Sequence, residues 1–165
     1  MISENEIKKK ICETSLKISR DYKNKKLILI GILKGSFIFL SDLSRKISID
    51  HEIDFIAASS YKGTSSTREL KITKDIELDI NNKDVLLVED IVDTGNTMSA
   101  LIDLFKAFRP NSIKVCSLID KHERREVSIK VNYSCFSLEK GFIVGYGLDY
   151  NEKYRHLPAI YDLKL

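Results

Sequence analysis

The stretch VLLVEDIVDTGNTMSALIDLF, residues 85–105, decides the fold because its pattern changes along its length. It begins with a continuous apolar run, which is typical of a strand that is covered on both faces. Three carboxylates, Glu89, Asp90 and Asp93, then interrupt this run. The small, hydroxyl-rich turn TGNT (94–97) follows, and the apolar residues after it have the spacing of a helix. A strand, a turn and a helix in this order predict one unit of a parallel α/β sheet.

The rest of the chain alternates between strands and helices in the same way. We predict helices over residues 3–22, within 34–47 and from Met98 through Phe108 to an end near Arg109–Pro110, and strands over 27–33, 51–61, 71–76, 84–89, 113–120 and within 141–150. In the second helix, Phe37, Leu40 and Leu43 are expected to face the core. Residues 62–70, KGTSSTREL, have no apolar side chain before the last, which predicts a mobile loop. The pattern favours an α/β fold with a mostly parallel central sheet, in a single domain over residues 1–165.

The acidic end of the strand at 84–89 is expected to lie in a binding site, because ligands of open α/β sheets bind beyond the carboxyl ends of the strands. The turn opens a helix whose first amides can hold a phosphate, helped by Gly95 and by the hydroxyls of Thr94 and Thr97. Helix capping by Asp93 or Thr94 is an alternative, but capping does not need three acids. Adjacent carboxylates can accept hydrogen bonds from a vicinal diol. The stretch therefore predicts a ligand with a phosphate at one end and hydroxyls, or a metal, at the other, such as a ribose 5-phosphate.

Composition excludes some classes of function and favours one compartment. The 165 residues carry a net charge of only +3, from 27 basic and 24 acidic side chains, so composition gives no support for a nucleic-acid partner. No apolar run approaches the ~18 residues of a membrane span, so no membrane partner is expected. The three cysteines, Cys12, Cys116 and Cys135, have no metal-like spacing and are expected to be buried free thiols. An odd number of cysteines without a signal peptide favours the cytoplasm.

Two other phosphate-binding motifs do not fit. The Walker pattern is absent, because Lys34 precedes Gly35 in LKGSF. The segment GYGLDY (145–150) has two glycines but neither a third glycine nor a following helix, so it is a weak match to a dinucleotide-binding fingerprint.

Several motifs together identify a resemblance. VLLVEDIVDTGNTM resembles the phosphoribosyl-pyrophosphate signature of type I phosphoribosyltransferases. GILKGSFIF, SSYKGT, LIDKHERR and FIVGYGLDYNEKYRHLPAIY resemble the hypoxanthine-guanine phosphoribosyltransferases in the same order. The likeness spans nearly the whole chain from residue 27, and its C-terminal motif points to 6-oxopurine bases. It implies the type I fold, with a small hood from the chain termini. It also implies Mg²⁺-dependent purine salvage, in which hypoxanthine (and guanine) reacts with 5-phosphoribosyl 1-pyrophosphate to give IMP (GMP) and pyrophosphate.

The resemblance assigns a role to each polar residue of the opening stretch. Glu89 and Asp90 would hold the ribose hydroxyls, directly or through Mg²⁺. Asp93 would be the general base at the purine N7, since proton removal must accompany attack on an oxocarbenium-like sugar. The 5′-phosphate would be cradled by Thr94, Gly95, Asn96 and Thr97.

Two further segments before this stretch receive roles from the resemblance. Lys34 and Gly35 would form the pyrophosphate loop, in which the Leu33–Lys34 peptide is often cis in this family. Ser60 and Tyr61 would begin a lid that closes over the transition state. The polar loop that follows them suits such gating, because the intermediate must be shielded from water.

The C-terminal part would bind the base and the leaving group. Lys121 would donate to the purine O6, Phe142 would stack on the base, and the backbone of Ile143 would meet its edge. Asp149 would bind a second Mg²⁺, and Arg155 would contact pyrophosphate. A plainer interpretation of Arg155 is an ion pair with a neighbouring glutamate in an exposed turn.

Some features leave the interpretation open. His122 stands where many bacterial relatives have proline, so the chain departs from the family pattern directly after Lys121. The basic cluster of Lys121, Arg124 and Arg125 is either a solvated face or a subunit contact, and we favour a subunit contact for Arg125 in a homodimer or homotetramer. One alternative function is a xanthine- or guanine-preferring phosphoribosyltransferase. Another is a phosphoribosyltransferase-fold RNA-binding regulator of pyrimidine genes, which would need a basic face.

Overall fold

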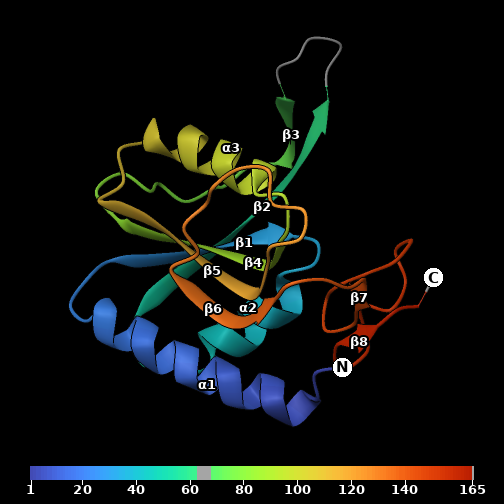
Figure 1. The fold of residues 1–165 in the computed structure, drawn as a ribbon. Helices are drawn as coiled ribbons and strands as arrows, with labels where there is room; N and C mark the ends of the chain where they lie inside the picture. Colours follow the sequence, from blue (N-terminus) through green and yellow to red (C-terminus); the bar gives the residue numbers. More distant parts are fainter. Residues whose placement is uncertain (63–67, 165) are drawn as a thin grey trace.

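The central sheet has the predicted α/β architecture. The computed structural model describes residues 1–62 and 68–164. Within them the strands of the main sheet are β1 (Leu27–Leu33), β2 (His51–Lys62), β3 (Arg68–Lys74), β4 (Asp84–Val92), β5 (Ser112–Lys121) and β6 (Tyr133–Leu138). They lie in the order β3-β2-β1-β4-β5-β6 (Figure 1), and only β3 among them is antiparallel to its neighbour. The prediction of a mostly parallel sheet is confirmed.

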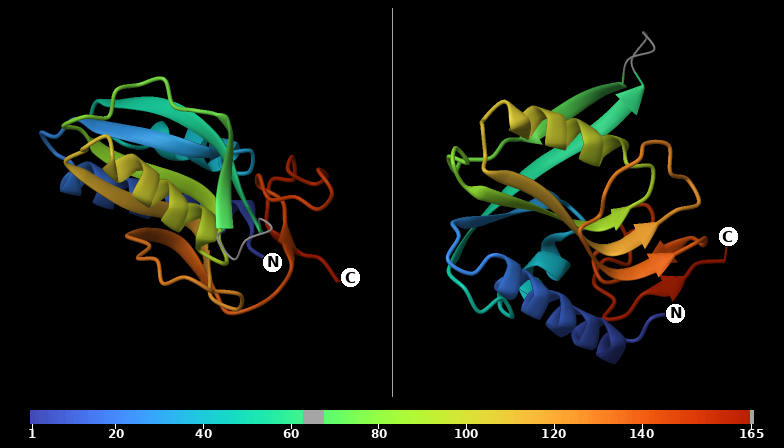
Figure 2. Two further views of the ribbon diagram at one scale, coloured as in Figure 1. Left: turned by 90° about the horizontal axis from the view of Figure 1, so that it is seen from above. Right: turned by 60° about the vertical axis from the view of Figure 1, so that its left-hand side comes forward.

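Helices cover both faces of this sheet. α1 (Glu4–Asp21) and α2 (Phe37–Ser44) lie on one face, and α3 (Asn96–Lys106) lies on the other (Figures 1 and 2). α1 begins with a capping box, in which the backbone amide of Ser3 donates to the Glu6 carboxylate at 2.8 Å and the Glu6 amide donates to the Ser3 hydroxyl at 3.3 Å. This arrangement satisfies two amides that the helix itself cannot pair.

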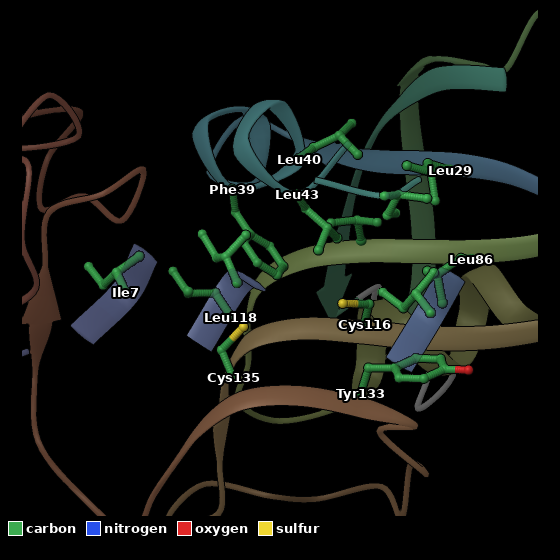
Figure 3. Close-up of a cluster of buried hydrophobic side chains, with 14 of the residues drawn as sticks. Ile7, Leu29, Phe39, Leu40, Leu43, Leu86, Cys116, Leu118, Tyr133 and Cys135 are labelled. Carbon is green, nitrogen blue, oxygen red and sulfur yellow. The ribbon is translucent and has the colours of Figure 1, made fainter. Parts of the chain in front are cut away.

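Two hydrophobic cores hold the strands between these layers. Alternate residues of β1 point to opposite faces, so that Leu29 packs toward α1 and α2 while Ile28 and Ile30 pack toward α3. Burial of each such side chain contributes about 1.5–3 kcal/mol relative to exposure. The first core is shown in Figure 3, where the labelled side chains are Ile7, Leu29, Phe39, Leu40, Leu43, Leu86, Cys116, Leu118, Tyr133 and Cys135.

The C-terminal segment forms the small hood that the resemblance implied. β7 (Ile143–Val144) pairs with β8 (Tyr161–Asp162) in antiparallel fashion. Ile2 and Ile160 exchange two backbone hydrogen bonds of 2.9 Å, which ties the start of the chain to the hood. The hood and both termini lie together at one edge of the molecule, as Figure 1 shows.

Two predictions about buried side chains are wrong. In α2, Phe37 is exposed and Phe39 is buried instead, because Phe37 is only the first residue of the helix and the inner face runs through Phe39, Leu40 and Leu43. Cys12 is exposed, since it lies on α1 next to the buried Ile11 but turned about 100° away from it.

Other helix and strand boundaries also differ from the predictions. The helix expected to reach Phe108 ends at Lys106, and Phe108 is exposed.

The loop predicted at 62–70 is shorter, because β2 continues to Lys62 and β3 already begins at Arg68. The rest of that loop, 63–67, lies outside the described residues. β6 was not predicted at all. In the part of the chain that the structure describes, no helix is long and apolar enough to span a membrane.

Candidate active site

The acids of the opening stretch lie where β4 ends, next to a cavity of about 390 Å³. β4 runs beyond the predicted residue 89, to Val92. Asp90 is buried, and one of its oxygens accepts a hydrogen bond from the Ile91 amide at 2.9 Å. Burial raises the pKa of Glu89 well above its usual range, and the neighbouring Asp90 carboxylate raises it further. A cation placed between these two acids would relieve both effects.

The cavity brings together residues from four segments that are far apart in the sequence. Its lining contains most of the predicted substrate residues: Leu33, Lys34, Gly35, Glu89, Asp90, Asp93, Thr94, Gly95, Thr97, Asp149 and Arg155. Ala58, Ser59, Ile91 and Met98, which were not predicted, also line it. Acidic and basic side chains therefore line the same cavity, which suits a ligand that carries both hydroxyls and phosphates.

Asp93 has a carboxylate oxygen that is available for chemistry. Its Oδ1 is buried and has no hydrogen-bond partner within the described part of the chain. Its Oδ2 lies 3.6 Å from the guanidinium of Arg124, which is itself largely exposed. A buried acceptor without a partner is uncommon in native proteins and is typical of a group that meets a ligand.

The turn after Asp93 is shaped by a glycine and by a neighbouring loop. Gly95 has a φ of +84°, and a Cβ there would lie 2.7 Å from the carbonyl oxygen of Val127. The carbonyl of Thr94 accepts hydrogen bonds from the amides of Glu126 (3.0 Å) and Val127 (3.1 Å). α3 begins directly after Gly95, at Asn96. The amides at the start of α3 are therefore held in place from outside the turn, as a phosphate site requires.

Asn96 is the one member of this turn that the structure places differently. Thr94, Gly95 and Thr97 line the cavity, but Asn96 does not. Its side-chain amide donates to the Glu126 carboxylate at 3.0 Å. Asn96 could contribute its backbone amide to a phosphate rather than its side chain.

The Leu33–Lys34 loop and the hood approach each other closely at two glycines. The Leu33–Lys34 peptide bond is cis. A Cβ on Gly35 would lie 1.8 Å from a carboxylate oxygen of Asp90, and a Cβ on Gly147 would lie 2.1 Å from the Gly35 carbonyl oxygen. No larger residue fits at either position without movement of the backbone or of the acid.

Cations from both segments share one hood glutamate. The Lys34 ammonium lies 2.9 Å from the Glu152 carboxylate, and an Arg155 nitrogen lies 3.3 Å from the same oxygen. Arg155 also pairs with Asp149 at 2.9 Å and donates to the Gly147 carbonyl at 2.8 Å. The hydrogen bond from Lys34, followed by that from Arg155, lowers the pKa of Glu152. The plainer interpretation of Arg155 is thus correct in this state, since it does pair with Glu152.

Lys121 ends β5 as a buried residue rather than a solvated one. It is 6% exposed, and its ammonium lies 3.2 Å from the Glu123 carboxylate, whose pKa it lowers. The amide of His122 donates to the Leu138 carbonyl at 3.1 Å, a hydrogen bond that proline at this position could not make.

The predicted base-binding residues of the hood do not line the cavity. Phe142 is 40% exposed and meets Tyr150 edge-on, with ring centroids 5.5 Å apart. Ile143 begins β7. The predicted start of the lid, Ser60 and Tyr61, lies near the end of β2.

Arg125 is not turned outward as a subunit contact would require. Its side chain is 15% exposed, and its guanidinium hydrogen-bonds to residues of the same chain. The sequence did not reveal these contacts of Arg125, nor the position of Glu152 beside Lys34.

The acids fit a particular mode of Mg²⁺ binding. Among the described residues no group of three or more His, Cys, Asp or Glu side chains could by itself hold a metal ion. Mg²⁺, however, is usually bound by one or two carboxylates together with substrate phosphates. The Glu89–Asp90 pair and the single Asp149, all facing one cavity, match that requirement.

Comparisons with known proteins agree with this geometry. Residues 2–151 match the family model of the phosphoribosyl transferase domain. The chain is 48% identical to hypoxanthine phosphoribosyltransferase of Escherichia coli K12, over 97% of this chain and 92% of that protein. It is 45% identical to hypoxanthine-guanine phosphoribosyltransferase of Streptococcus pyogenes, over 99% of this chain and 92% of that protein. A crystal structure of a hypoxanthine phosphoribosyltransferase from Staphylococcus aureus superposes with a TM-score of 0.95, at 42% identity, over 99% of this chain and 90% of that one.

Proposed function

Because this chain belongs to the phosphoribosyltransferase family, and within it to the hypoxanthine and hypoxanthine-guanine phosphoribosyltransferases, it is an enzyme of purine salvage. We propose that it converts hypoxanthine, and guanine as well, with 5-phosphoribosyl 1-pyrophosphate into IMP or GMP and pyrophosphate. The observation that carries this proposal is the single cavity in which a phosphate turn, an acid pair and two cations meet. We further propose that the one domain, residues 1–165, carries the whole activity.

The sugar and its phosphate would be bound by the β4–α3 turn. Backbone amides of 94–97 and the hydroxyls of Thr94 and Thr97 would hold the 5′-phosphate, favoured by the positive end of the α3 dipole. Glu89 and Asp90 would accept hydrogen bonds from the ribose hydroxyls. The support for these roles is that all of these side chains line the cavity.

Asp93 would act as the general base. Its unpartnered Oδ1 can take the proton from the purine N7 while another ring nitrogen attacks C1 of the ribose. General acid–base catalysis of this kind contributes about 10²–10⁴-fold to a rate. Lys121 would donate to the O6 atom, Phe142 would stack on the base, and the Ile143 backbone would meet its edge.

The leaving pyrophosphate would be held by the Lys34–Gly35 loop and by Arg155. Bound at Glu89, Asp90 and Asp149, Mg²⁺ would supply positive charge that stabilises the departing phosphates. Lys34 and Arg155 are neutralised by Glu152 and Asp149 in the ligand-free protein, so pyrophosphate would have to replace Glu152 on both cations. Ser60 and Tyr61 would begin a lid that excludes water from the reacting sugar.

The test is an assay with purified protein, 5-phosphoribosyl 1-pyrophosphate, Mg²⁺ and one purine at a time, with nucleotides identified by mass. We expect nucleotide from hypoxanthine and from guanine, and loss of the product when EDTA removes the metal. Product from xanthine in place of hypoxanthine would favour the xanthine-preferring alternative. Absence of product with every 6-oxopurine would contradict the proposal.

We also propose a homodimer or homotetramer in the cytoplasm. The exposed aromatic side chains of Phe37 and Tyr154, which line one shallow surface hollow, would be covered by a second subunit. Cys12, Cys116 and Cys135 are free thiols, as expected of a reducing compartment. Light scattering of the purified protein would measure the oligomeric state, and a monomer at micromolar concentration would contradict the first proposal.

A further inference from the structure

The guanidinium of Arg125 connects the ends of two neighbouring strands. Its Nε donates to the carbonyl of Asp93 at 2.8 Å. Its Nη2 donates to the carbonyl of Val92 (2.8 Å), to the carboxylate of Asp120 (2.6 Å) and to the carbonyl of Lys121 (2.9 Å). The two hydrogens of Nη2 are shared among three acceptors, as in other three-centre hydrogen bonds. Arg125 therefore contacts the last residues of β4 and β5 at once.

These contacts lie where the regular strand pairing stops. The register of β4 and β5 ends with Val92 opposite Asp120. Asp93 and Lys121 come directly after this last pair, beyond the point at which the β4–β5 ladder can fix their separation. Arg125 binds the carbonyl oxygens of both, so one rigid, planar group holds the two backbones together.

The chemistry of this clamp requires arginine. The side chains of Arg125 and Asp120 are only 15% and 17% exposed, and a charge so far removed from water needs a charged partner. Lysine could keep the ion pair with Asp120. It could not reach the Asp93 carbonyl at the same time, because its ammonium is a single point whereas the Nε and Nη2 positions of arginine are fixed relative to each other.

We propose that Arg125 is a positioning residue, which sets the separation of Asp93 from Lys121 and thereby aligns the purine. This inference rests on the proposed function, in which Asp93 meets N7 and Lys121 meets O6. N7 and O6 lie on one edge of a rigid 6-oxopurine, where both act as acceptors in guanine nucleotides. Two protein groups that meet this edge must keep a constant separation, and Arg125 is bonded to the backbone of both.

The 5′-phosphate site is held by different bonds. The Thr94 carbonyl is bound by the backbone amides of Glu126 and Val127, not by the Arg125 side chain. A variant of Arg125 should therefore impair handling of the purine more than binding of 5-phosphoribosyl 1-pyrophosphate. If Arg125 served only overall stability, its variants would impair both functions to the same extent.

The experiment compares Arg125→Lys with Arg20→Lys, a control at an exposed arginine in the last turn of α1. For Arg125→Lys we expect kcat/KM for hypoxanthine to fall about 10²-fold, as for a misplacement of about 1 Å. The Kd of 5-phosphoribosyl 1-pyrophosphate, measured by calorimetry, should stay at the wild-type value. Arg20→Lys should change none of these quantities.

Two further variants keep the inference falsifiable if Arg125→Lys folds poorly. Asp120→Asn retains the shape of the charged partner and should give a smaller loss in the same direction. Arg125→Ala should regain activity when methylguanidinium is added, and Arg20→Ala should not respond.

Wild-type kcat/KM in Arg125→Lys, or parallel losses of kcat/KM, Kd and Tm without rescue of Arg125→Ala, would overturn the role of Arg125. A wild-type enzyme that makes no IMP would instead overturn the proposed function.

Discussion

The β4–α3 turn and the hood face the same cavity, but they are held in place by different forces. The turn follows a buried strand, and its Thr94 carbonyl is bound by two backbone amides of the 126–127 segment. The hood is anchored by the short strands β7 and β8, by the bridge to Ile2 and by Tyr146, Leu148 and Ile160 in the first core. Where it faces the cavity, however, Arg155 is held by ion pairs with Asp149 and Glu152. Backbone hydrogen bonds cannot easily be exchanged for a ligand, whereas exposed ion pairs can.

This difference indicates that the turn is rigid before substrate binds, whereas the ion pairs of the hood can rearrange on binding. The turn is preformed, so the phosphate site and the general base that we propose for it would need little rearrangement when substrate binds. Lys34 of the loop after β1 and Arg155 of the hood both pair with Glu152, an internal anion at the place where we propose that pyrophosphate binds. Exposed ion pairs are individually weak, so a diphosphate can displace Glu152 at little cost.

The largest expected effect tests the turn. Asp93→Asn keeps the shape of the side chain but removes its capacity to take a proton. We expect kcat to fall by about 10²–10⁴-fold. Binding of 5-phosphoribosyl 1-pyrophosphate, measured by calorimetry, should change much less, because we propose that residues 94–97, and not Asp93, hold the 5′-phosphate. Near-normal turnover in this variant would remove Asp93 from the role of general base.

The next effect tests the junction between hood and loop. In Gly147→Ala, the new methyl group would meet the Gly35 carbonyl at 2.1 Å and push the hood away. We expect affinity for 5-phosphoribosyl 1-pyrophosphate to fall about tenfold, which corresponds to about 1.4 kcal/mol.

Gly141→Ala is the matched control for this junction. Its φ of +120° imposes similar backbone strain, but its Cβ would lie 3.5 Å from the nearest atom of Asp162. Equal losses of affinity in the two variants would mean that strain, and not the close approach to Gly35, accounts for the effect.

A smaller effect concerns Glu89, which lies near the end of β4. The raised pKa of Glu89 means that the folded protein binds this proton more tightly than the unfolded chain does. Its contribution to stability is therefore greatest at low pH and is lost as the pH rises from the usual glutamate range through the raised native value.

Glu89→Gln has no charge to bury, so its Tm advantage over the wild type should increase between pH 5 and pH 8. Each 1 kcal/mol corresponds to about 2–4 °C for a chain of this size. Glu77→Gln, at an exposed position, is the control and should give a difference in Tm that does not vary with pH. Calorimetric scans without metal or ligand would measure both differences in Tm. A difference for Glu89→Gln that does not vary with pH would show that ionisation of Glu89 does not destabilise the folded protein.

The smallest effect tests whether pyrophosphate displaces Glu152 from its ion pairs with Lys34 and Arg155. Glu152→Gln removes the internal anion from Lys34 and Arg155, so pyrophosphate should bind about two- to fivefold more tightly, the scale of exposed ion pairs. Glu13→Gln, which breaks an exposed pair with Lys10 on α1, should leave this affinity unchanged. Weaker binding of pyrophosphate to Glu152→Gln would mean that Glu152 supports the site rather than competing for it.

The same contrast explains what the sequence could predict. The turn is contiguous, so the switch from apolar run to acids to helix is visible within residues 84–97. The Lys34–Glu152 pair joins residues 118 positions apart, which no local pattern reveals. Arg125 was wrongly predicted to be a subunit contact, because three of its four acceptors are main-chain carbonyls. Every residue type has such a carbonyl, so the sequence does not show which ones an arginine will bind.

Short elements and the exact ends of helices could also not be predicted from local sequence patterns. β7 and β8 have two residues each, too few to show a period. The inner face of α2 was assigned to Phe37 because the start of this helix could not be located to within one residue from spacing alone.

The most direct test of the account is a competition between two purines. Hypoxanthine and adenine, at equal concentration, react with limiting 5-phosphoribosyl 1-pyrophosphate and Mg²⁺ in one vessel, and the ratio of IMP to AMP gives the ratio of the two kcat/KM values. Lys121 can only donate a hydrogen bond, so it matches the O6 acceptor of hypoxanthine and opposes the amino group of adenine. We predict that IMP forms and that AMP is negligible. AMP in an amount comparable to IMP would contradict the assignment of this site to 6-oxopurines.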